Sequence, residues 1–110
     1  MSGRSDADLV GDMREAMQRI MAYTDGMDFA AFLDNTQVQD AVVRNLQIIG
    51  EAVKRLSVDF RKQHAQIEWK KIAGLRDKVI HEYFGVNWDI VWDVVHKRIP
   101  ELKAQLSTHA

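Results

Sequence analysis

Apolar residues recur every three or four positions through most of this sequence, and this spacing constrains the fold more than any other feature. Because an α-helix turns by about 100° per residue, such spacing places apolar side chains on one helix face. The pattern predicts helices over residues 6–24 and 69–84, and two more that begin at 36 and 88. No segment alternates apolar and polar residues as a half-buried strand does. The sequence therefore predicts an all-α fold, an antiparallel bundle of four to five helices.

Capping residues predict where two helices of the first half begin. Asp28 is placed to cap a short helix over 29–33. Thr36 and Gln39 fit a capping box for the next helix. The apolar stripe of that helix continues to Phe60, which predicts the longest helix of the chain.

The second half has its own boundary signals. Residues 61–68 are polar and basic, so we expect a connection there, with His64 exposed. Gly85 is expected to end the helix over 69–84, and Asn87 to cap the last helix. Pro100 cannot occupy an unbroken helix interior, because it lacks an N–H and its ring clashes with the preceding turn. We therefore expect a kink or a restart near Ile99-Pro100.

Length and composition indicate one soluble domain over residues 1–110. The chain has 46% hydrophobic and 28% charged residues, which is ordinary for a globular protein. It has no apolar run of about 18 residues that would predict a membrane span. Its first residues lack the apolar segment of a signal peptide. It has no cysteine, which excludes disulfides and thiolate nucleophiles. We expect a cytoplasmic protein.

The net charge of −1 conceals an uneven distribution. Residues 1–53 carry nine acidic and four basic side chains, whereas residues 54–81 carry eight Lys or Arg and three acids. The local excess of +5 is compatible with a phosphate-bearing partner, although on charge alone a solvated basic face is the preferred explanation.

Two polar residues interrupt the apolar stripes. Arg76 lies among the apolar residues of the helix over 69–84, and Asn45 lies within the stripe of the longest helix. A guanidinium always carries its charge, so burying it without a partner is unfavourable. An amide oxygen is a suitable acceptor for it. The pattern therefore predicts that Asn45 and Arg76 meet.

Arg76, His81 and Tyr83 together carry chemistry suited to RNA cleavage. His exchanges protons near neutral pH, and Arg binds phosphate in a bidentate manner. In such a reaction the 2′-hydroxyl attacks the adjacent phosphate, His81 transfers a proton and Arg76 stabilises the developing charge. The sequence shows no metal-binding pattern and no serine triad, so a metal-independent reaction is favoured.

The ideal spacing of these residues presents a geometric difficulty. Five residues turn a helix by about 500°, so His81 points about 140° away from Arg76, whereas Tyr83 nearly overlays it. A looser helix near Gly85 or a long reach by Arg76 could bring them together. We favour a third solution, a two-fold dimer that joins two copies of the motif in one cleft.

The stretch 72–84, with its Arg-x4-His-x-Tyr pattern, resembles the signature of HEPN-domain ribonucleases of the HepT type. The resemblance continues over 86–92, over 40–52 and over 23–26, so it spans nearly the whole chain in the expected order.

This resemblance implies the toxin of a toxin–antitoxin pair, a homodimeric, metal-independent endoribonuclease with its site at the dimer cleft. Arg76 and His81 would be the catalytic pair, and Asp77 the supporting polar residue beside Arg76. Asn45, the partner that the apolar stripes predict for Arg76, would also support the pair. The partner would be a minimal nucleotidyltransferase antitoxin of the MntA type, which transfers AMP to Tyr83 and silences the nuclease. The toxin would form a homodimer, either by itself or within a larger hetero-oligomer that contains the antitoxin. Added negative charge beside Arg76 would exclude substrate phosphate. No cofactor is implied.

Asp77 departs from this pattern, in which Asn is common. Its carboxylate could compete with phosphate for Arg76, or it could orient His81, and the sequence leaves both open. Two other functions also remain open. One is a non-catalytic HEPN module that binds a nucleotidyltransferase or a nucleotide. The other is a plain structural bundle in which Arg76 and Asn45 satisfy each other.

Overall fold

The computed structural model describes residues 3–81 and 86–107, with the backbone alone at positions 76 and 78–81. All regular secondary structure in these ranges is helical, which confirms the all-α prediction. The elements are α1 (Asp6–Thr24), α2 (Phe29–Leu33), α3 (Thr36–Arg55), α4 (Val58–Gln63), α5 (Trp69–His81), α6 (Trp88–Asp93), a π-helical turn (Val94–Arg98) and α7 (Ile99–Ser107).

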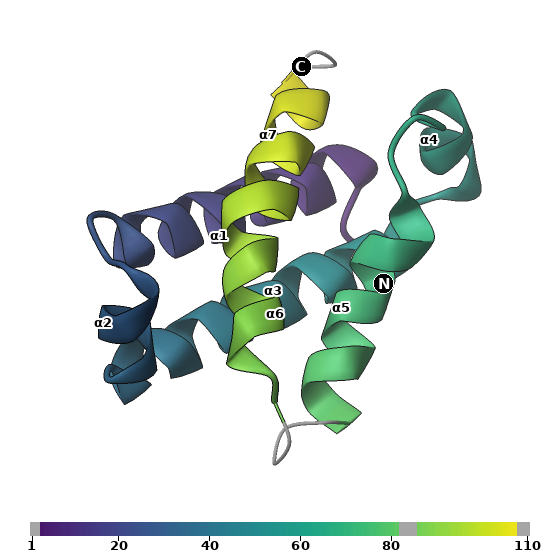
Figure 1. Ribbon diagram of the computed structural model, residues 1–110. Coiled ribbons are helices and arrows are strands. Elements are labelled where there is room, and N and C mark those ends of the chain that lie inside the picture. The colour runs from purple at the N-terminus through teal and green to yellow at the C-terminus, as the bar shows by residue number, and fades with distance from the viewer. Residues whose placement is uncertain (1–2, 82–85, 108–110) are drawn as a thin grey trace.

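The helices form antiparallel pairs that cross one another. Helices α1 and α3 pack together and run in opposite directions (Figure 1). Helix α5 packs on α3, and the chain then returns through α6, the π-turn and α7, opposite in direction to α5 (Figure 1). The return brings α7 back onto α1, where the Arg14 Nη2 donates to the backbone oxygen of Leu106 at 2.9 Å. This contact ties the last helix to the first.

The core is formed mainly by the predicted apolar stripes. Helix α1 contributes Met13, Met17 and Ile20, all with no exposed surface, and α3 contributes Val42, Ile49 and Val53 in the same way. The later helices add Val91, Val94, Val95, Ile99, Leu102 and Leu106. Within the described ranges, no helix is long and apolar enough to cross a membrane.

The predicted caps of the two short helices are confirmed, and the predicted cap of α3 is wrong. Asp28 and Asn87 each accept hydrogen bonds from the first turn of the helix that follows. Helix α3 is capped by Asn35, and Thr36 is already its first residue. The Gln39 side chain donates instead to two backbone oxygens at the end of α2, at 3.0 and 3.1 Å. Asn35 precedes the expected cap by one residue and offers a stronger capping side chain.

Helix α3 ends at Arg55, so its predicted continuation to Phe60 is wrong. Phe60 belongs to α4, which also occupies part of the expected connection over 61–68. The break is fixed by Ser57, whose N–H and hydroxyl donate to the Asp6 carboxylate at 2.9 and 2.6 Å. The same hydroxyl accepts the first N–H bond of α4 at 3.1 Å. A residue at the start of α1 therefore determines where α3 stops.

The expected irregularity near Pro100 is present as the π-turn. This wider turn over Val94–Arg98 ends immediately before Ile99, and Pro100 occupies the second position of α7. In an α-helix, a proline has no N–H to donate to the carbonyl of the residue four positions earlier. Its ring also clashes with that carbonyl group. The wider turn changes the hydrogen-bond pattern at this point and lets the chain continue without a break.

Candidate functional site

The predicted catalytic stretch belongs to α5 and the residues that follow it. Helix α5 runs over Trp69–His81, so the backbones of Arg76 and His81 are helical, as predicted. Their side chains, and Tyr83 and Gly85 entirely, lie outside the described residues. The roles predicted for Arg76, His81 and Tyr83 therefore stay predictions.

The register of α5 nevertheless places these positions on its faces. Position 76 follows Ile72 by four residues and Ala73 by three, and both of these side chains pack against the core. Because residues three and four apart share a helix face, position 76 lies on the core-facing side of α5. Position 81 follows Asp77 by four residues and so shares the face of Asp77.

Asp77 is bound by a residue of another helix. The Nζ atom of Lys54, near the end of α3, lies 2.6 Å from the Oδ1 atom of Asp77. Both side chains remain partly exposed, at 39% and 45% of their full surface. Gly50, one turn before Lys54, is buried.

Asn45 is directed to the other side of α3. Nine residues separate it from Lys54, and on a helix this is a rotation of about 180°. Its Nδ2 donates to the backbone oxygen of Ala41 at 2.8 Å. Its Oδ1 is buried and has no hydrogen-bond partner among the described atoms. The expected pairing with Arg76 stays untested. The residue lines a small open pocket beside α1, together with Ala16, Ile48 and three charged side chains, Asp12, Glu15 and Arg19.

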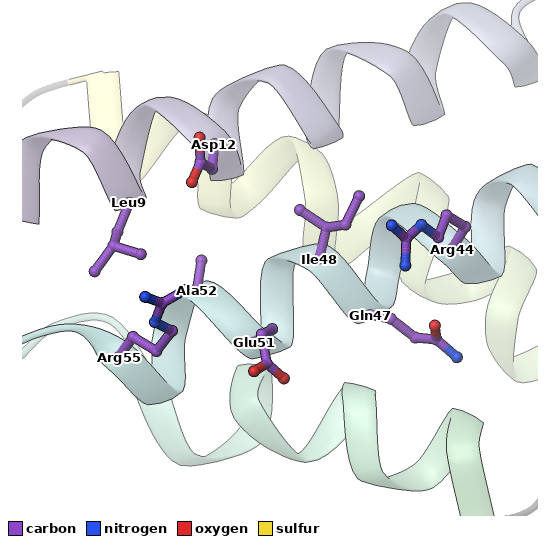
Figure 2. Close-up of a pocket in the computed structure, with 8 residues that line it drawn as sticks. All are labelled: Leu9, Asp12, Arg44, Gln47, Ile48, Glu51, Ala52 and Arg55. Carbon is purple, nitrogen blue, oxygen red and sulfur yellow. The ribbon is translucent and has the colours of Figure 1, made fainter. Parts of the chain in front are cut away.

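A groove of about 340 Å³ lies between α1 and α3 (Figure 2). Arg44 and Arg55 stand near its two ends, and Glu51 points toward α5 (Figure 2). Asp12 faces the groove from α1 and is paired with Arg4 at 2.5 Å. The positive and negative side chains of this groove nearly balance, so its charge alone selects no ligand.

A second groove, of about 420 Å³, separates α5 from the returning segment of α6, the π-turn and α7. Its floor is largely apolar and is formed by Ile72, Leu75, Ile90, Val94 and Leu102. Glu68 stands at its rim between Lys71 at 2.7 Å and Arg98 at 3.8 Å. The hydrogen bond from Lys71 lowers the pKa of Glu68 and keeps it ionised. Helix α5 is therefore flanked by α3 on one side and by an apolar groove on the other.

The expectation that His64 is exposed is wrong. His64 is buried, with its ring stacked on Phe60 at a centroid distance of 4.2 Å. Its Nδ1 lies 2.9 Å from the Phe60 backbone oxygen. The indole N–H of Trp69 donates to the backbone oxygen of His64 at 3.1 Å. This cluster anchors the first residue of α5, and the four-residue spacing of Phe60 and His64 was the signal that could have revealed it.

Comparisons with known proteins show which family the chain belongs to. Residues 13–108 match the protein family described as ribonuclease HepT-like. A Caldanaerobacter subterraneus protein with a provisional RNase name is 52% identical over 81 residues, which are 74% of this chain and 72% of that protein. A Methanocaldococcus jannaschii protein, also provisionally named an RNase, is 47% identical over 89 residues, 81% of this chain and 74% of its own. A Thermococcus cleftensis protein named "Probable ribonuclease HepT" is 42% identical over 102 residues, 93% of each chain. No solved structure matches the chain.

Proposed function

We propose, from the premise that this chain belongs to the HepT-like ribonuclease family, that it is the toxin of a toxin–antitoxin pair. It cleaves RNA internally and without a metal ion, with Arg76 and His81 as catalytic residues. The observation that carries the proposal is the family match over residues 13–108, which includes the whole Arg76–Tyr83 stretch. The RNase names of the relatives agree with RNA as the substrate class. The helical bundle has the all-α architecture expected of a HEPN-like domain.

The reaction needs one group that accepts a proton and one that donates a proton. The 2′-oxygen forms a bond to phosphorus while the bond from phosphorus to the 5′-oxygen breaks. A base takes the proton of the 2′-hydroxyl, and an acid returns a proton to the departing 5′-oxygen. One neutral and one protonated imidazole fill these roles. Two copies of His81 are available if two protomers face each other across a cleft.

Arg76 would supply the positive charge that stabilises the transition state of this reaction. The transition state spreads negative charge over the phosphoryl oxygens, and a guanidinium binds two of them at once. Ile72 and Ala73, four and three residues before Arg76 in the sequence, pack against the core. A guanidinium beside such apolar side chains would be little screened by water and would therefore interact more strongly with phosphate.

Tyr83 is the proposed control point, with a nucleotidyltransferase antitoxin as the partner. Transfer of AMP forms a bond from the tyrosyl oxygen to the α-phosphorus of ATP and releases pyrophosphate. Tyr83 follows Arg76 by seven residues, two helical turns, if the helix continues that far. An attached phosphodiester would then compete with substrate phosphate for Arg76.

Cleavage by the purified chain tests the proposal. The protein is made without any nucleotidyltransferase, and its intact mass establishes that Tyr83 is unmodified. Incubated with structured cellular RNA in excess chelator, the wild type is expected to cut internal bonds. Arg76→Ala and His81→Ala are each expected to lower kcat by at least about 100-fold while the far-ultraviolet circular dichroism stays unchanged.

The control is Lys97→Met, which removes a surface charge from the π-turn and is expected to retain full activity. An unmodified wild-type chain that cuts no RNA would contradict the proposal. The non-catalytic HEPN module that binds a nucleotidyltransferase or a nucleotide would then be the better explanation.

A further inference from the structure

We propose that the groove between α1 and α3 binds one strand of the RNA substrate by its phosphates, with Arg44 and Arg55 as the binding residues. The proposal rests on the function proposed above and assigns to it a surface outside the Arg76–Tyr83 stretch. These two arginines set the affinity for RNA and leave the chemical step unchanged.

The first argument is that Arg44 and Arg55 are the basic side chains of α1 and α3 that bind nothing in the described part of the chain. The other three Lys or Arg side chains of these helices are each bound, in the contacts Arg14–Leu106 (2.9 Å), Arg19–Glu15 (2.5 Å) and Lys54–Asp77 (2.6 Å). Arg44 and Arg55 are both exposed, and both line the groove. A guanidinium without a partner retains all its donors for the oxygens of a phosphate.

The second argument is the direction of the acidic side chains. The formal charges of the groove nearly balance, but its two carboxylates are engaged or directed elsewhere. Asp12 is paired with Arg4 at 2.5 Å, and Glu51 points toward α5 (Figure 2). The charge that remains available is therefore positive, and it lies near the two ends of the groove.

The third argument is the length between the two cations. Arg44 and Arg55 are eleven residues apart on α3, which is three turns and about 16 Å along the helix axis. A single phosphate cannot bind both. A stacked strand advances about 3.4 Å per nucleotide, so this length corresponds to about five nucleotides. The lining between the arginines is apolar apart from one amide, and includes Leu9, Ile48, Ala52 and Gln47. Such a lining suits riboses, with the amide for a phosphate or a base edge.

The position of the groove decides which part of the RNA it binds. Helix α3 faces α1 on one side and packs on α5 on the other (Figures 1 and 2). A helix with its side chains is about 10 Å across, so a strand in the groove lies about one helix diameter from the helix that includes Arg76 and His81. The groove therefore binds nucleotides that flank the cleaved bond, not the bond itself.

Binding of an RNA that cannot be cleaved tests the proposal without the chemical step. The probe carries 2′-O-methyl groups throughout, which block the attacking hydroxyl, and fluorescence anisotropy gives its Kd at several salt concentrations. We expect Arg44→Gln and Arg55→Gln each to weaken binding about 5–10-fold and to lower the slope of log Kd against log salt by about 0.7, the value for one phosphate contact on a single strand. Arg44→Lys keeps the charge and should keep the slope.

The matched control is Lys103→Gln, which removes an exposed cation of α7 that has no ion pair in the described ranges. It should leave the slope as in the wild type. Wild-type affinity should also rise as the probe is lengthened from about three to about eight nucleotides, and the double variant Arg44→Gln with Arg55→Gln should lose most of this rise. Slopes and a length dependence that are the same in the wild type and in the arginine variants would overturn the proposal. An acidic segment of a partner protein would then be the better occupant of the groove.

Steady-state kinetics separates this proposal from the RNase proposal. If the chain cuts RNA, Arg44→Gln and Arg55→Gln should raise KM and leave kcat within about twofold, because they bind substrate and transition state equally. A fall in kcat with KM unchanged would overturn the groove as a binding surface. Binding with the expected slopes by a wild-type chain that cuts no RNA would refute the RNase proposal and keep the groove. Cleavage with the same KM in the wild type and both variants would refute the groove and keep the RNase proposal.

Discussion

Asn45 uses only part of its hydrogen-bonding capacity. Its amide nitrogen donates within α3, whereas its Oδ1 is buried without a partner among the described atoms. A buried acceptor that loses water and gains nothing destabilises a protein by about 1–3 kcal/mol. An open pocket of about 170 Å³ lies beside it, lined by Ala16 and Ile48 and by the charged side chains of Asp12, Glu15 and Arg19. An apolar side chain at position 45 would therefore avoid this cost, whereas the predicted pairing with Arg76 requires the amide oxygen.

Replacing Asn45 by leucine tests whether Oδ1 is without a partner or is bound by Arg76. If Arg76 does not bind Oδ1, we expect Asn45→Leu to raise the free energy of unfolding by about 1 kcal/mol, because an acceptor without a partner is replaced by apolar atoms beside Ala16 and Ile48. Urea denaturation measures the change, with Asn45→Ala as the control that removes the acceptor and fills nothing. A loss of stability in Asn45→Leu would show that Oδ1 has a partner, as the predicted pairing with Arg76 requires.

Predictions for single residues succeeded where the neighbours in sequence decide the outcome. Asp28 and Asn87 cap the helices that follow them, because a cap acts within three residues. His64 was mistaken for an exposed residue because its surroundings include Trp69 of the next helix, and the local signal from Phe60, four residues earlier, was missed. Lys54 gave no signal at all, since its partner is 23 residues away.

At the level of helices, the sequence predicted which segments are helical but not where α3 stops. The apolar stripe of α3 continues into α4, so periodicity alone indicates one long helix. The backbone turns at Ser57 because Asp6 of α1 accepts two hydrogen bonds there. These bonds lower the pKa of Asp6, the hydroxyl having the larger effect. A contact between distant segments thus overrides the local pattern.

The same contact makes part of the stability dependent on pH. A carboxyl whose pKa is lowered by folding contributes stability above its unfolded pKa, near 4, and loses it as pH falls through the folded pKa. Asp6 is solvent-screened, so we expect Asp6→Ala to lower stability at pH 7 by about 0.5 kcal/mol. This corresponds to a fall in Tm of about 3 °C.

Calorimetry from pH 7 down to about pH 3 checks this prediction, because the difference from the wild type should shrink as pH falls below about 4 toward the lowered pKa of Asp6. Asp40→Ala, which removes an exposed carboxylate of α3, is the control for the loss of one negative charge. A difference that stays constant across this range would contradict it.

The molecule as a whole is longer than a compact chain of its size requires. It measures 41 × 28 × 25 Å, and its radius of gyration is 14.0 Å, against about 13 Å expected for 110 residues. The extra length accompanies two open grooves, one on either side of the layer that α3 and α5 form. The groove beside α5 exposes apolar side chains that a small bundle does not cover by itself.

We expect the protein to be a homodimer in solution, with each protomer stabilised by the other. Light scattering should give twice the chain mass of 12.7 kDa. Because unfolding of a dimer releases two chains, Tm should rise by about 3 °C for each tenfold increase in concentration. A single-chain mass with a concentration-independent Tm would contradict the dimer and the shared cleft that depends on it.

The π-turn has a consequence for changes in chain length. The buried residues Val91, Val95 and Ile99 recur every four positions, a spacing that drifts by about 40° per step around a regular α-helix. The π-turn absorbs this drift, so α6 and α7 present their apolar sides to the same core. A deletion of one residue here would leave both helices facing the core but would turn the segment into an ordinary α-helix. Pro100 would then clash with the turn before it. The length of this segment and the presence of Pro100 are therefore coupled. A chain one residue shorter here would need another residue in place of Pro100.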